Sequence, residues 1–298
     1  MTTSQQDYNF WVKAAAISST LTAIFLLFIK LYAWLQSDAS VMLASATDSM
    51  LDLLASATNL FILKIALSPA DKEHRFGHGK AESLGSLFQA SFICGSAILL
   101  ILGGIDRTLN PVENFNNNIA LIVTVITLVV TLLLVAFQYF VVTRTKSLVI
   151  KADMLHYKSD MLLNVSVLIA LFITQYSWPS ADGVFTIAIG LYLLLSAREI
   201  LKESLDQLMD KELEQEDLVK IKEIIKAETR AQGAHEIRTR KAGPVTFIQF
   251  HLVLPDELSL VEAHQIGDQL EEKITAQFSP CEVLIHHDPV SVLKQNHE

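Results

Sequence analysis

Six long apolar stretches constrain this chain more than any other feature. Each is long enough for a helix that crosses a bilayer, which needs roughly 20 mostly apolar residues. The stretches cover residues 11–35, 41–67, 82–105, 118–142, 154–176 and 182–204. The fourth contains the uncharged run ALIVTVITLVVTLLLVAF. The pattern predicts an α-helical membrane protein with six transmembrane helices, and it excludes a single soluble domain.

The composition changes at Asp210. The segment 210–298 holds 17 of the 32 acidic residues and 10 of the 23 basic residues, as in an ordinary acidic soluble domain. We therefore expect a transmembrane domain over 1–209 and a cytoplasmic domain over 210–298.

Periodicity predicts the elements of the second domain. Residues 214–230 and 258–278 have the apolar spacing of amphipathic helices, whereas 235–243, 244–255 and 281–289 resemble strands. The resulting order, αββαβ, predicts a small ferredoxin-like α+β fold with two helices on one face of an open sheet.

Basic residues predict the orientation. Lys and Arg gather in the loops between spans 2 and 3 and between spans 4 and 5, and the other loops have almost none. Because cytoplasmic loops carry an excess of Lys and Arg, both termini are expected inside a multi-pass protein of the inner (plasma) membrane. Lys30 lies within span 1, and we expect it to extend outward.

Several function classes are excluded or disfavoured. Cys94 and Cys281 form no CxxC motif, which disfavours a disulfide framework and a thiolate metal site. An acidic chain without a basic cluster is a poor partner for nucleic acid. The sequence contains no Ser/His/Asp array and no Walker loop. The chain is therefore not expected to be an enzyme, and any pumping must use an ion gradient.

Ionisable residues inside two spans form the first candidate site. Asp48 and Asp52 in span 2, and His156 and Asp160 in span 5, are each spaced i, i+4 and so share a helix face. Charges within a span are costly and normally face an interior partner. Three carboxylates and one imidazole would suit a divalent cation such as Zn²⁺. Alternatively, such residues are simply hydrated near the cytoplasmic ends of the helices, an alternative that stays open for Asp153 and Lys158.

Two further clusters contain histidine. The loop PADKEHRFGHGKAE brings Asp71, His74 and His78 within eight residues, either as metal ligands or as part of a solvated loop. In the last third, strand ends could gather a second set, unless these are ordinary surface histidines. That set comprises His235, His251, His264, His286, His287 and Asp288.

These motifs resemble those of the cation diffusion facilitator family, particularly its bacterial zinc and ferrous-iron efflux transporters. DxxxD in span 2, HxxxD in span 5 and the loop HRFGHGKAE carry the resemblance, which covers nearly the whole chain. It implies that the span residues form the transport site, that the loop residues form a second site, and that the C-terminal set forms a binuclear site. His287 stands where close relatives commonly have Gln, so its backbone carbonyl is the alternative ligand atom.

The resemblance also implies a homodimer that exchanges cytoplasmic Zn²⁺, and also Fe²⁺ or Cd²⁺, for external protons. Lys80 and Asp210 resemble a charge pair that joins protomers or domains near the membrane. A metal channel without proton coupling and a membrane metal sensor are the alternatives. An intramembrane metallohydrolase is disfavoured because no HExxH motif is present.

Overall fold

The computed structural model describes residues 3–37, 40–110, 118–174 and 180–295. The chain divides into two compact units. One is Asn9–Leu205, and the other is Asp206–Glu298 together with Met1–Tyr8.

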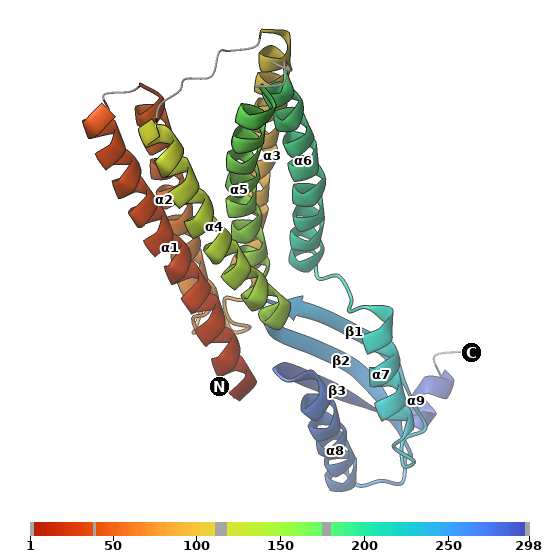
Figure 1. The fold of residues 1–298 in the computed structure, drawn as a ribbon. Coiled ribbons are helices and arrows are strands. Elements are labelled where there is room, and N and C mark those ends of the chain that lie inside the picture. The colour runs from red at the N-terminus through yellow and green to blue at the C-terminus, as the bar shows by residue number, and fades with distance from the viewer. Residues whose placement is uncertain (1–2, 38–39, 111–117, 175–179, 296–298) are drawn as a thin grey trace. The chain divides into compact units, whose positions relative to one another are not determined.

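Long helices make up the first unit (Figure 1). They are α1 (Thr3–Ser37), α2 (Ser40–Ala66), α3 (Lys80–Leu109), α4 (Asn118–Thr145), α5 (Leu148–Thr174) and α6 (Ala181–Leu208). Over the described residues, all of these except α5 are long and apolar enough to cross a membrane. The first half of α5 carries two lysines, two aspartates and His156. It packs against α3 and α4, inside the helical unit.

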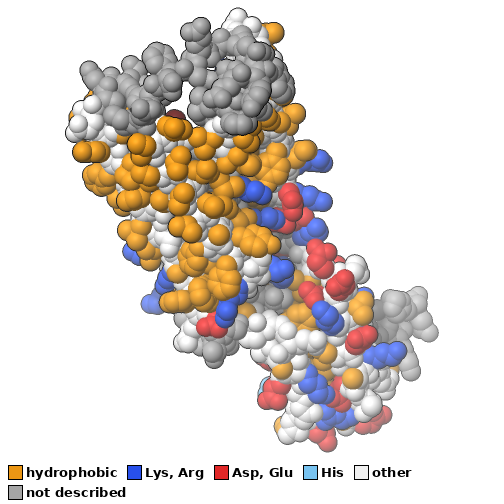
Figure 2. Space-filling model, in the orientation of Figure 1, with side chains coloured by type: hydrophobic (Ala, Val, Ile, Leu, Met, Phe, Trp, Pro, Cys, Tyr) orange, Lys and Arg blue, Asp and Glu red, His pale blue; other side chains and the backbone are white. Residues whose placement is uncertain are grey.

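The helical unit has an apolar surface and a partly polar interior. Figure 2 shows hydrophobic side chains over much of the visible face of the helices. Phe28, Phe61 and Leu133, for example, are each more than 60% exposed. Conversely, Gln138 and Asp153 are almost completely buried. Apolar side chains directed outward on long helices are typical of a protein whose solvent is lipid.

Helix α5 begins six residues before the predicted start of the fifth span, because a side chain from α3 caps it. A carboxylate oxygen of Glu82 accepts hydrogen bonds from the Ser147 hydroxyl at 2.5 Å and from the Leu148 backbone N–H at 2.9 Å. The first N–H groups of a helix have no partner within the helix and favour an anionic acceptor. Glu82, 3% exposed, thereby joins α3 to the start of α5.

Small residues allow α3 and α6 to pack closely. A methyl group added at Gly183 would lie 2.6 Å from the carbonyl oxygen of Gly104 and 2.6 Å from the backbone nitrogen of Thr108. The same helices are joined by an ion pair between Arg107 and Asp182 at 2.9 Å. Close backbone approach at small residues is a common way for membrane helices to associate.

The second unit confirms the αββαβ order. It contains α7 (Gln215–Lys226), β1 (Gly233–Ala242), β2 (Val245–Leu254), α8 (Leu260–Phe278) and β3 (Cys281–Pro289), followed by an unpredicted short helix, α9 (Val290–Gln295). The strands form a sheet in the order β1-β2-β3. Strands β1 and β2 are antiparallel, and β2 and β3 are parallel.

Both longer helices of this unit pack on the same face of the sheet. Alternate residues of β2, including Ile248 and Phe250, form one buried core with Ile221 of α7 and Leu270 of α8. Successive residues of a strand point to opposite faces. His251 is out of phase with this core, so it lies on the face that α7 and α8 leave uncovered.

Candidate metal sites

The first cluster joins α2 and α5. The Nε2 atom of His156 lies 3.0 Å from a carboxylate oxygen of Asp52 and 3.9 Å from one of Asp160. Ligand atoms of all three residues lie within 4.8 Å of one another. The imidazole is 13% exposed and the two carboxylates are 17% and 31% exposed. Two carboxylates and an imidazole this close together can hold a divalent cation.

The fourth predicted member, Asp48, lies outside this group. It is one helical turn before Asp52 on α2, and it is exposed. A different charged residue faces this part of α2. The ammonium of Lys30 donates a hydrogen bond to Ser49 Oγ at 2.7 Å, and Ser49 is completely buried. The expectation that Lys30 extends outward is therefore wrong, because a buried hydroxyl on the neighbouring helix binds its ammonium.

Asp153 is not a hydrated residue at a helix end. It is 1% exposed, and its carboxylate accepts hydrogen bonds from one side chain of each of the four helices α1 to α4. The donors are Ser19 at 2.6 Å, Gln138 at 2.7 Å, Asn59 at 2.9 Å and Gln89 at 3.3 Å. A carboxylate with four neutral donors is satisfied without a counter-ion. This network was not predicted from the sequence. The available signal was the presence of Asn59, Gln89 and Gln138 inside apolar spans, where polar side chains need a partner.

The second cluster occupies the loop between α2 and α3. The two oxygens of Asp71 lie 3.4 Å from His74 Nδ1 and 3.4 Å from His78 Nε2, and the rings are 4.6 Å apart. A tight turn produces this arrangement, with Gly77 at a φ of +78°, which glycine adopts readily. Hydrogen bonds from the backbone N–H groups of His74 and Glu73 hold the pKa of Asp71 below its usual value.

The third cluster spans the three strands of the second unit. His235 pairs with His251 across β1 and β2, and His251 pairs with His286 across β2 and β3. Asp288, two residues after His286, shares their face. Its oxygens lie 3.1 Å from His235, 2.8 Å from His251 and 3.2 Å from His286. A bulge between His235 and Arg238 follows the first of these residues.

Asp288 is electrostatically suited to a cation. Desolvation raises its pKa, but a hydrogen bond from His251 and the charges of His251, His286 and His235 outweigh that effect. The net result is a pKa below the usual value, which keeps the carboxylate ionised. Ionised carboxylate and imidazole are good ligands for borderline divalent metals.

The structure does not bring His264 and His287 into this cluster. His264, on α8, is exposed and lies 3.5 Å from Asp268. His287 follows His286 directly, so its side chain points to the opposite face, where its Nε2 lies 2.7 Å from the position of a methyl group at Gly267. Desolvation there lowers the pKa of His287. Strand alternation was the signal that separates His287 from its neighbours.

The predicted partners Lys80 and Asp210 belong to different units. In its own unit, Asp210 lies 3.4 Å from Arg240, whose guanidinium stacks over the ring of Phe247. Asp210 has a φ of +56°, at the turn that follows α6.

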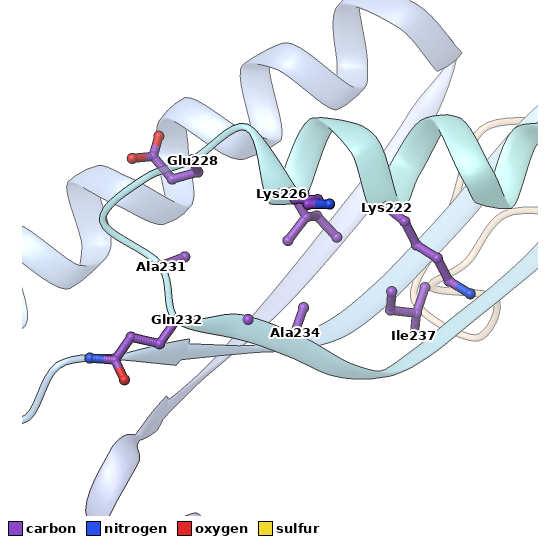
Figure 3. Close-up of a pocket in the computed structure, with 9 residues that line it drawn as sticks. Lys222, Lys226, Glu228, Ala231, Gln232, Ala234 and Ile237 are labelled. Carbon is purple, nitrogen blue, oxygen red and sulfur yellow. The ribbon is translucent and has the colours of Figure 1, made fainter.

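A pocket in the second unit is separate from these clusters. It has a volume of 230 Å³ and lies between α7 and the start of β1. Figure 3 shows Lys222 and Lys226 on the helix, and Ala234 and Ile237 on the strand. None of its lining residues is a candidate metal ligand.

Comparisons with known proteins match both units to domains of one protein family. The model of the cation efflux transmembrane domain matches residues 16–209, and that of the cytoplasmic domain of cation efflux proteins, a dimerisation domain, matches residues 213–290. The cation-efflux pump FieF of Shewanella oneidensis is 47% identical over 290 residues, which cover 97% of this chain and 98% of the relative.

FieF of Escherichia fergusonii is 44% identical over 288 residues, covering 97% of this chain and 96% of the relative. A solved structure of the putative zinc transporter CzrB in a Zn form is 32% identical and covers 28% of this chain and 94% of its own, with a TM-score of 0.27. The near-complete coverage by the pumps and the two consecutive family matches agree with the fold. This chain is a membrane protein of the cation efflux, or cation diffusion facilitator, family.

Proposed function

We propose that this cation efflux transporter exports Zn²⁺, and also Fe²⁺ and Cd²⁺, in exchange for protons. The observation that carries the proposal is the convergence of Asp52, His156 and Asp160 between two helices of the membrane unit. Ionisable side chains within a membrane helix are costly, and they mark ion pathways when they face one another. The relatives named as cation-efflux pumps and as a putative zinc transporter support a metal cargo.

The ligand chemistry favours borderline divalent ions. Imidazole with carboxylate suits Zn²⁺ and Fe²⁺, and the cluster offers no thiolate or thioether for Cu⁺. Asp48 joins the cluster as a fourth ligand if the helices shift during transport, since it lies one turn from Asp52. The site then has the three carboxylates and one imidazole that the sequence pattern predicts.

Proton coupling follows from competition at the same atoms. A metal ion needs deprotonated ligands, so protons that bind His156 or the carboxylates displace it. Histidine exchanges its proton near physiological pH, which makes it the suitable partner for this exchange. Metal that enters from the cytoplasm leaves when external protons take its place, and the inward proton gradient then drives export.

The other two clusters are proposed as non-transporting metal sites. His235, His251, His286 and Asp288 would bind metal in the cytoplasmic domain, stabilise a homodimer and favour transport; the dimerisation domain supports this role. The loop residues Asp71, His74 and His78 would bind a further ion.

We also propose the arrangement predicted from the sequence, with domains over 1–209 and 210–298. Both termini are then cytoplasmic in the inner membrane, and Lys80 and Asp210 form a charge pair at the junction. This orientation puts the basic loops on the cytoplasmic side.

Zn²⁺ flux into proteoliposomes tests the function. Wild type, Asp52→Ala and the control Asp182→Ala are reconstituted with a fluorescent zinc indicator inside, with and without an imposed proton gradient. Asp182 is a carboxylate of the same unit that pairs with Arg107, away from the cluster. We expect flux that rises with the gradient in wild type and in the control and is lost in Asp52→Ala. Flux indifferent to the gradient would indicate a channel, and binding without flux would indicate a sensor.

A further inference from the structure

Lys30 is a charged residue of the membrane unit that the proposed transport reaction does not use. Its ammonium lies 2.7 Å from the hydroxyl of Ser49, which is completely buried on α2. Ser49 stands directly after Asp48 and one turn before Asp52. The lysine of α1 is therefore held at the segment of α2 that carries both predicted carboxylate ligands.

The charge of Lys30 acts on carboxylates of both ligand helices. It interacts electrostatically with Asp48 on α2 and with Asp160 on α5. Another lysine of the membrane unit, Lys158, is placed differently. Its ammonium bonds to the hydroxyl of Tyr192 on α6 at 2.5 Å and lies 5.0 Å from the centre of that ring. These two lysines of the membrane unit therefore have different surroundings, and Lys30 is held beside the ligand helices.

Counting charges shows what Lys30 contributes. In the four-ligand arrangement proposed for transport, in which Asp48 joins the cluster, a bound metal needs a neutral His156 and ionised carboxylates. Asp48, Asp52 and Asp160 then carry a net charge of about −3, which the lysine reduces to about −2. A divalent cation then leaves the loaded site neutral. Without the lysine, the loaded site would keep a negative charge, and a trivalent cation would match it better. Residual charge is costly in a poorly hydrated interior, so this difference affects both affinity and selectivity.

We propose that Lys30 is a specificity-determining residue that sets the charge of the transport site for a divalent cation and weakens binding enough for release. This inference rests on the proposed function, because it takes the cluster of Asp52, His156 and Asp160 to be the transport site. The lysine acts through its charge and is not itself a metal ligand.

Neutral and charge-conserving variants test the role. Zn²⁺ flux and its inhibition by Lu³⁺, a small trivalent ion, are measured for wild type, Lys30→Gln and Lys30→Arg, with Lys158→Gln as the matched control. Removing a charge near the site is expected to lower the half-saturating Zn²⁺ concentration about tenfold and to lower the maximal flux. The inhibition constant of Lu³⁺ should fall by a larger factor than the half-saturating concentration of Zn²⁺. Lys30→Arg and Lys158→Gln should behave as wild type.

Equal behaviour of Lys30→Gln and Lys158→Gln would overturn the proposal. So would an effect of Lys30→Arg as large as that of Lys30→Gln, because the charge would then not be the cause. Lys30→Met, which keeps the unbranched stem, is the second neutral variant if Lys30→Gln does not fold.

Equilibrium dialysis of Zn²⁺ with the detergent-solubilised proteins separates this inference from the proposed function. If wild type binds Zn²⁺ without moving it, the proposed transport function fails. Tighter binding by Lys30→Gln than by wild type would still support the role of the lysine, and unchanged binding would contradict it.

Discussion

Replacing Asp153 with Ala is expected to destabilise the helical unit more than any other single carboxylate change there. Asp153 accepts hydrogen bonds from side chains of α1, α2, α3 and α4, and so joins five helices at one buried carboxylate. The substitution leaves four buried donors without their acceptor. It also removes the cost of burying a charge, which acts in the opposite direction.

The magnitude follows from the number of donors. Hydrogen bonds between membrane helices contribute about 0.6 kcal/mol each on average, which gives a lower value of about 2 kcal/mol for four bonds. Leaving a buried donor unsatisfied costs about 1–3 kcal/mol. The Ser19 hydroxyl keeps the Ala15 carbonyl as an acceptor at 3.1 Å, so the donors of Asn59 and Gln138 give an upper value of about 6 kcal/mol. The cost of leaving these donors unsatisfied exceeds the gain from no longer burying a charge. The reason is that the hydrogen bonds of the native protein already offset most of the cost of burying the carboxylate.

The apparent melting temperature in detergent measures this effect. At roughly 2–3 °C per kcal/mol for a chain of this size, Asp153→Ala should melt about 5–15 °C below wild type. Asp153→Asn should lie between them, because its amide keeps one acceptor oxygen. Asp182→Ala, which removes an exposed ion pair worth at most about 1 kcal/mol, is the control. A loss in Asp153→Ala no larger than in this control would refute the reasoning.

Three further predictions concern packing, acid stability and the cytoplasmic cluster. Gly183→Ala should lower the melting temperature by several degrees, because its methyl group meets the backbone of α3; Gly103→Ala, with open space around it, should not. The Arg230 hydrogen bond lowers the pKa of Glu228 to about 2. The ionised Glu228 carboxylate therefore stabilises the fold fully above about pH 4.5, and this stabilisation is lost as the pH falls toward 2. Glu228→Gln should reduce the part of the unfolding free energy that depends on pH in this range. Unfolding measured at a series of pH values tests this. Asp288→Asn should reduce metal binding by the cytoplasmic domain at least tenfold in dialysis, and unchanged binding would exclude this residue as a ligand.

Much of this architecture was predictable because it depends on local periodicity. Apolar length predicted the helices, and alternation predicted the αββαβ order. Spacing of i, i+4 placed His156 and Asp160 on one face of α5, where their ligand atoms lie within 4.8 Å of a carboxylate oxygen of Asp52. The partners of Asp153 were not predictable in this way, since they come from four other helices and depend on how those helices pack.

The remaining differences between the predicted and the observed site concern the direction in which side chains point. His287 lies on the face covered by α8 because strand residues alternate, a rule that the sequence alone could have supplied. The direction of Lys30 could not be predicted, because it depends on the buried hydroxyl of Ser49 on a neighbouring helix. Polar interior partners thus override the usual outward extension of a lysine in a membrane helix.

Proton movement driven by a metal gradient tests the central claim most directly. Proteoliposomes containing a pH-sensitive dye receive a Zn²⁺ gradient with no initial pH difference, and wild type is compared with Asp52→Ala and Asp182→Ala. Exchange at a shared site predicts that Zn²⁺ entering the vesicles drives protons out, so that the lumen becomes alkaline in wild type and Asp182→Ala and stays unchanged in Asp52→Ala. Zn²⁺ uptake without a pH change in wild type, or the same pH change in Asp52→Ala, would contradict the account.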